Sequence, residues 1–178
     1  MRVYIAIDFH NSTKKYFESI GNSIKPFCLE GKFTEVNNFH LTLRFIGDVD
    51  ELEIPKLKEV IDSATCSIEP FSLKISSLGI FSRKKTNILW LGIDENQILS
   101  TICSKLSILL QQNKVHFYDK GFMPHITLGR QVTLIDSFDI NSFSSFEKSN
   151  IIINNISLMQ SKEIHGKLNG VPIYTVYF

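Results

Sequence analysis

The chain alternates short apolar runs with stretches in which apolar residues recur every three or four positions. Runs rich in β-branched and aromatic side chains are typical of buried strands. Such runs occupy residues 3–9, 33–36, 40–46, 70–81, 88–93, 125–128, 151–153, 156–159 and 171–178. Several of them follow one another without an intervening helix, which favours antiparallel pairing. The pattern therefore predicts an α+β protein in which strands outnumber helices.

Helical spacing of apolar residues is found in three places. Phe17, Ile20 and Ile24 define the first predicted helix. The second begins near Pro55, a residue that a helix tolerates only in its first turn, and the third covers residues 98–109. Each of these helices has one apolar face, so we expect each to pack against a sheet.

The two halves of the chain repeat the same order of segments. Residues 3–8 are similar to residues 89–94, and each segment leads through a helical stretch to a His-x-Thr-Leu strand. His40 lies 32 residues after Asp8, and His125 lies 31 residues after Asp94. Similarity at a constant period indicates a duplicated unit, although short apolar patterns can also produce two similar strands by chance.

Duplication gives a definite expectation for the fold. We expect a single α+β domain over residues 1–178, built from two pseudo-symmetric lobes. Each lobe would be an antiparallel β-sheet with helices packed on its outer face. An active-site cleft would lie between the lobes, because two units related by a local two-fold bring equivalent strands face to face.

The candidate chemistry lies in the two repeated tetrapeptides, His40-Leu41-Thr42-Leu43 and His125-Ile126-Thr127-Leu128. Side chains alternate faces along a strand, so each histidine shares one face with its threonine while the aliphatic residues share the other. Each copy is thus predicted to have one buried and one reactive face. Together they would place two imidazoles and two hydroxyls in one site.

Composition is ordinary for a folded protein, with 43% hydrophobic and 21% charged residues in a chain of 178. The net charge of +1 disfavours long-duplex binding driven by the field of the whole molecule. The first apolar run is too short for a signal peptide or a membrane span, so we expect a cytoplasmic protein without membrane contact. We also expect a monomer.

Other kinds of site are not indicated. The sequence has no glycine-rich phosphate loop and no dinucleotide fingerprint. Its three cysteines are widely spaced and suggest neither disulfides nor zinc. The remaining histidines have no metal-ligand spacing and are interpreted as surface residues: His10, His116 and His165. The basic loop Arg83-Lys84-Lys85 is a candidate phosphate contact, and an exposed hairpin tip is an equally good interpretation.

Two longer segments carry a resemblance to a known family. The segments 40–47 (HLTLRFIG) and 124–130 (PHITLGR) resemble the paired His-x-Thr-x motifs of the 2H phosphoesterase superfamily. Within it, the chain is similar to the RNA 2',3'-cyclic phosphodiesterases, formerly called 2'-5' RNA ligases. The similarity runs almost end to end, through residues 2–7, 88–92 and 156–161.

The resemblance implies a metal-independent hydrolase that needs no cofactor and acts on RNA with a 2',3'-cyclic phosphate end or on a small nucleotide. It implies that His40 is the general acid, His125 the general base, and the product a 2'-phosphomonoester. Arg130 matches an arginine expected near the phosphate, but strict alternation puts it on the Leu128 face, so a bulge or strand end must intervene. Met123 departs from the basic or polar residue common before the Pro-His pair.

Acid–base chemistry by two imidazoles suits this reaction. Water must be deprotonated on one side of phosphorus and the leaving alkoxide protonated on the other, and imidazoles of ordinary pKa serve both roles without a metal. Thr42 and Thr127 would donate hydrogen bonds to the phosphate oxygens. Three alternatives remain: a 2',5'-phosphodiesterase, a small cyclic-nucleotide phosphodiesterase, and a non-catalytic module that binds RNA ends. The same site could also run in reverse as a 2'-5' RNA ligase.

Overall fold

The computed structural model describes residues 1–178 except 83–86, 120, 141–142 and 144–148. Its strands are β1 (Arg2–Asp8), β2 (Cys28–Phe33), β3 (His40–Asp48), β4 (Phe71–Phe81), β5 (Ile88–Ile93), β6 (His125–Leu134), β7 (Asn150–Ile153), β8 (Asn155–Ile164) and β9 (Lys167–Tyr177). Its helices are α1 (Asn11–Ile24), α2 (Ile54–Thr65) and α3 (Gln97–Gln112), with short 3-10 turns η1 (Lys25–Phe27), η2 (Val36–Asn38) and η3 (Glu51–Glu53). The predicted α+β class is confirmed.

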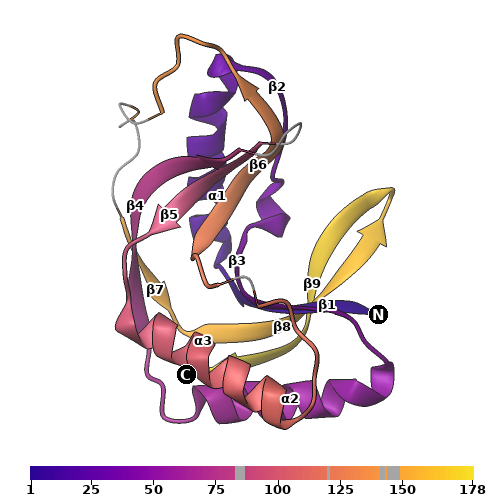
Figure 1. Ribbon diagram of the computed structural model, residues 1–178. Coiled ribbons are helices and arrows are strands. Elements are labelled where there is room, and N and C mark those ends of the chain that lie inside the picture. The colour runs from indigo at the N-terminus through magenta and orange to yellow at the C-terminus, as the bar shows by residue number, and fades with distance from the viewer. Residues whose placement is uncertain (83–86, 120, 141–142, 144–148) are drawn as a thin grey trace.

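The strands form one curled, antiparallel sheet with the order β7-β4-β5-β6-β3-β1-β8-β9, and β2 also pairs with β6. Within the described residues, β3 and β6 pair through a single couple, Leu41 and Ile126. The sheet therefore divides into two lobes at this point. The first-motif lobe contains β3, β1, β8 and β9, and the second-motif lobe contains β6, β5, β4, β7 and β2 (Figure 1).

Helices cover the outer side of each lobe, as predicted. Helices α2 and α3 pack against each other and run along the first-motif lobe, where α2 contacts β8 and α3 contacts β3 (Figure 1). Helix α1 stands beside the second-motif lobe and contacts β6. Their apolar faces join the sheet in one buried core that includes Ile5, Phe17, Leu57, Ile102 and Ile126.

Each lobe takes strands from both halves of the chain. Strand β4 follows the first motif in sequence but pairs with β5 of the second half. Strand β8 follows the second motif but pairs with β1 of the first half. The two lobes thus have matching strand orders, β3-β1-β8 and β6-β5-β4. In each lobe the third strand comes from the other half of the chain. This symmetry is compatible with the duplicated unit, which stays a prediction.

Two local predictions were wrong. The strand predicted over 33–36 lies earlier, at β2, and the turn η2 follows it. The polar stretch 162–169, predicted only as a turn between the strands at 156–159 and 171–178, instead continues β8 and β9 as a long hairpin whose turn is His165-Gly166, with φ of 51° and 73°. A two-residue turn with both φ angles positive suits the twist of a hairpin. Both faces of this hairpin end are mostly exposed, so no apolar alternation marks it.

The basic loop Arg83-Lys84-Lys85 lies outside the described residues. Across the residues with a described placement, no helix is long and apolar enough to span a membrane.

Candidate active site

The two motifs meet where the lobes join. Leu41 and Ile126 are paired and fully buried against the core. In an antiparallel ladder with this register, His40 lies across from Thr127, and Thr42 lies across from His125. Because side chains alternate, all four point to the face opposite the core. We call this the site face.

Both histidines are held by the same hydrogen bond. The Nδ1 atom of His40 lies 2.7 Å from the carbonyl oxygen of Asn38, and Nδ1 of His125 lies 2.8 Å from the carbonyl oxygen of Met123. A carbonyl only accepts, so each Nδ1 must carry the proton and donate it. In the neutral ring, Nε2 then keeps its lone pair. In each neutral imidazole, Nε2 is therefore the ring nitrogen with a lone pair that can accept a proton.

Burial favours the neutral form of both rings. It lowers the pKa of His40 and of His125, while the hydrogen bonds to Asn38 and Met123 oppose the shift. The guanidinium of Arg130 lowers both pKa values further. The rings differ in one respect: the Asp8 carboxylate raises the pKa of His40, against the smaller lowering by Lys14. His40 is thus the ring with a carboxylate beside it.

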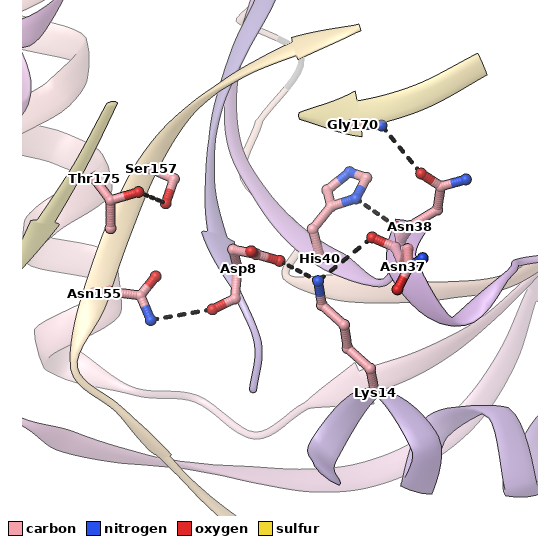
Figure 2. A network of polar contacts seen from close by, with 9 residues as sticks. All are labelled: Asp8, Lys14, Asn37, Asn38, His40, Asn155, Ser157, Gly170 and Thr175. Carbon is pink, nitrogen blue, oxygen red and sulfur yellow. Dashed lines mark hydrogen bonds and ion pairs between the residues drawn. The ribbon is translucent and has the colours of Figure 1, made fainter. Parts of the chain in front are cut away.

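Asp8 is fixed beside His40 by a small polar network (Figure 2). The two residues pair directly across β1 and β3. The Nζ atom of Lys14, on α1, lies 2.6 Å from Oδ1 of Asp8 and donates to the carbonyl oxygen of Asn37 at 3.4 Å. Asn155 donates its Nδ2 proton to the backbone oxygen of Asp8 at 3.1 Å. The ion pair partly offsets the carboxylate charge that His40 experiences.

The turn that holds His40 is itself attached to β9. Oδ1 of Asn38 accepts the Gly170 N–H at 3.0 Å (Figure 2). The Nδ2 atom of Asn38 donates to the carbonyl oxygen of Leu168 at 3.3 Å. At the other end of η2, Glu35 forms an ion pair with Lys167. The carbonyl that orients His40 is therefore fixed from two sides by the β8–β9 hairpin.

His125 has aromatic neighbours in place of this network. Phe81 meets its ring edge to face at 5.0 Å, and Trp90 lies 6.4 Å away. The Trp90 indole packs over Gly79, where an added Cβ would come within 2.2 Å of it. Met123, whose carbonyl holds His125, is 60% exposed. His125 is thus supported mainly by the neighbouring aromatic rings and by the carbonyl of an exposed loop residue.

Arg130 reaches the site face through a shift in strand register. Trp90 pairs with Thr127 while Leu89 pairs with Gly129, so Leu128 is an extra residue in β6. This bulge resets the alternation, and Arg130 is exposed where strict alternation would bury it. The influence of Arg130 on both imidazoles agrees with that position. The bulge required by the sequence argument is therefore present.

The first motif has a bulge at the same position. Ala6 pairs with Thr42 while Ile5 pairs with Arg44, which leaves Leu43 as the extra residue. Phe45 then occupies the place that Arg130 has in the other motif. Arg44 turns away from the site, because its guanidinium donates to Ser107 and to the carbonyl oxygens of Leu43 and Cys103.

The sequence argument missed Asp8, Lys14 and Asn38. Asp8 ends the repeated segment, but its counterpart Asp94 forms an ion pair with Lys74 at 3.6 Å, so the repeat did not single out Asp8 as a neighbour of a histidine. The other histidines are exposed, as predicted: His10, His116 and His165. Within the described part of the chain, no group of three or more His, Cys, Asp or Glu side chains could hold a metal ion.

Comparison with known proteins identifies the family. Residues 7–90 match the model of the LigT-like phosphoesterases. A protein of Methanocaldococcus jannaschii named RNA 2',3'-cyclic phosphodiesterase is 33% identical over 142 residues, covering 77% of this chain and 75% of the relative. A Bacillus subtilis protein of the same name is 30% identical over 169 residues, covering 90% and 89%. This chain therefore belongs to the LigT-like phosphoesterases of the 2H superfamily, which confirms the resemblance carried by the motifs.

Solved structures share the fold. TT0787 of Thermus thermophilus superposes with a TM-score of 0.83 at 18% identity, covering 99% of this chain and 97% of the other. Escherichia coli LigT complexed with 3'-AMP superposes with a TM-score of 0.79 at 22% identity, with the same coverage. The curled two-lobed sheet is thus the fold of this family.

Proposed function

We propose that the protein hydrolyses the 2',3'-cyclic phosphate end of RNA to a 2'-phosphomonoester, with His40 and His125 as the acid–base pair. The observation that carries the proposal is the Leu41–Ile126 pairing, because it gathers both histidines and both threonines on one face. The names of the relatives support the substrate class.

The two histidines differ in a way that suits different roles. A general base must be neutral, and burial and Arg130 favour neutral His125. A general acid must carry a proton; burial lowers the pKa of His40 as well, but the Asp8 carboxylate opposes that shift, and His125 has no such carboxylate contribution. His40 Nε2 then protonates the departing 3'-oxygen, while His125 Nε2 takes a proton from the attacking water. The cyclic P–O3' bond breaks as the new P–O bond to water forms.

Three further residues would stabilise the charge on phosphorus. Thr42 and Thr127 share the site face and donate hydroxyl hydrogen bonds to the non-bridging oxygens. Arg130 supplies a positive charge near both imidazoles. Two imidazoles perform the proton transfers, so the proposed reaction needs no metal ion.

The test is to offer the purified protein oligonucleotides ending in 2',3'-cyclic phosphate, with 2',5'-linked dinucleotides as controls. We expect a 2'-phosphate product and unchanged turnover in excess EDTA. Cleavage of the 2',5'-linked dinucleotides alone would indicate that the protein is a 2',5'-phosphodiesterase. Binding without turnover would favour an RNA-end-binding module. Loss of activity on chelation, restored by one divalent metal, would contradict the metal-free mechanism.

A further inference from the structure

A row of large side chains crosses the site face beside the reactive residues. Met159 pairs with Tyr4, Tyr4 pairs with Phe45, and Phe45 pairs with Tyr118 through an isolated bridge. Directly paired residues of a sheet point to the same face. These side chains therefore form one line across four neighbouring segments.

The neighbouring line has small side chains and contains the first motif. In it, Ser157 pairs with Ala6, and Ala6 pairs with Thr42. Tyr4 and Ala6 are two residues apart on β1, a rise of roughly 6.6 Å. The ring of Tyr4 lies 4.9 Å from the ring of His40. The row of large side chains thus runs roughly 6.6 Å from the row that contains Thr42, a proposed phosphate ligand.

The members of this row differ in exposure. Tyr4 and Met159 are 5% and 2% exposed and form a floor with Ala6, against which Phe45 packs. Tyr118 is 53% exposed, and its ring centre lies 5.3 Å from that of Phe45. The guanidinium of Arg2 lies 5.0 Å from the centre of the Phe45 ring. The open end of the row therefore combines two aromatic rings with one cation.

Aromatic rings and arginine together recognise the flat face of a nucleobase. Base–aromatic stacking tolerates every base, because each base has a π-face. An arginine near the rings adds cation–π attraction and can contact a phosphate. The chemistry of this surface fits the base of a bound nucleotide.

We propose that Arg2, Phe45 and Tyr118 form a nucleoside subsite that stacks the base of the nucleotide whose cyclic phosphate lies between the two histidines. The proposal rests on the proposed function and adds a specificity to it. The subsite favours nucleotides over cyclic phosphates without a base, and it accepts purines and pyrimidines alike.

The test compares adenosine 2',3'-cyclic phosphate with the base-free 2,3-cyclic phosphate of methyl riboside. We expect Tyr118→Ala to raise KM for the nucleotide about 10-fold, within the range of one lost stacking contact. The same variant should leave kcat/KM for the base-free compound within about two-fold. Tyr118→Phe should behave as wild type. Tyr177→Ala removes a tyrosine that is 70% exposed at the end of β9, and it should affect neither substrate.

Two results would overturn the subsite. Equal loss on both substrates would show that Tyr118 supports the structure, since it also packs beside Gly47. An unchanged KM for the nucleotide would show that the base binds elsewhere. If wild type hydrolyses neither these two compounds nor the oligonucleotides ending in 2',3'-cyclic phosphate, the proposed function fails. Calorimetric binding of adenosine 2'-phosphate to wild type and Tyr118→Ala then tests the subsite alone, and equal affinities or no binding to wild type would refute it.

Discussion

The two motif strands use one device to present a histidine and differ in what surrounds it. In both, Nδ1 donates to the carbonyl two residues earlier, and the fourth motif residue is a bulge. Around His40 a polar network of Asp8, Lys14 and the Asn38 turn adds to the Tyr4 ring, which lies 4.9 Å away. Around His125 the supports are the rings of Phe81 and Trp90. Under the proposed function, these different surroundings would suit His40 to act as acid and His125 as base.

The position after each bulge shows the same division. Arg130 stands there in the second motif, and Phe45 stands there in the first. A guanidinium suits the phosphate, whereas a ring suits the nucleoside. Each lobe would then contribute a different part of substrate binding.

Removal of either imidazole should have the largest effect on catalysis and should distinguish the roles of the two histidines. We expect His40→Ala and His125→Ala each to lower kcat by about 10²-fold or more. The double variant should lose less than the product, because the two act as a unit. A substrate with a much better leaving group needs no acid and should largely restore His40→Ala alone. Restoration of His125→Ala in its place would exchange the two roles.

Loss of one hydroxyl should have a smaller effect that is similar in the two lobes. Thr42→Val and Thr127→Val keep the side-chain size and remove one donor to the phosphate. We expect each to lower kcat on the order of 10- to 10³-fold, measured by single-turnover kinetics. Serine at either position should retain most activity. Valine variants with wild-type kcat would remove the threonines from the mechanism.

Release of the Asn38 turn should affect the His40 side only. Asn38→Ala removes the bonds to β9, and we expect kcat to fall about 10-fold with little change in KM. Asn37→Ala is the matched control, since Asn37 is exposed in the same turn and contributes its backbone oxygen. In a His40→Ala background, Asn38→Ala should not lower kcat any further. A second loss of similar size there would indicate general destabilisation.

The smallest expected effect is a displacement of the pH profile. Asp8→Asn removes the charge that raises the pKa of His40 and leaves Lys14 and Arg130 to lower it. A general acid works only below its pKa, so the basic limb of kcat against pH should move to lower pH. The acidic limb, which reports His125, should stay in place. Movement of the acidic limb, or of neither, would contradict the assigned roles.

Strong periodicity was sufficient to predict most of the fold. The apolar runs of β1 and β5 and the faces of α2 and α3 are each marked by local sequence, so they could be predicted. The exposed end of the β8–β9 hairpin could not, because pairing with its own partner strand stabilises it without apolar alternation. Strand exchange between the halves depends on long-range packing that no local pattern encodes.

The candidate site could be predicted only in part. His40, Thr42, His125 and Thr127 stand out because the tetrapeptide is repeated, and their roles stay predictions. Asn38 acts through a residue 132 positions away, Gly170, so only the folded chain relates it to His40. Its neighbour in sequence, Asn37, has the same side chain and no such contact. Residue type alone could not distinguish them.

The exchange of strands between the lobes also bears on the order in which the protein is made. Among the described strands, β1 leaves the ribosome before the others, yet its partner β8 begins at Asn155 and the outer strand β9 ends at Tyr177. A nascent chain therefore carries both histidine motifs for some time with one edge of β1 unpaired. Contacts so distant in sequence are slow to form, and unpaired edges invite aggregation until they close. Assembly of the His40 environment is thereby delayed until the last hairpin has been synthesised.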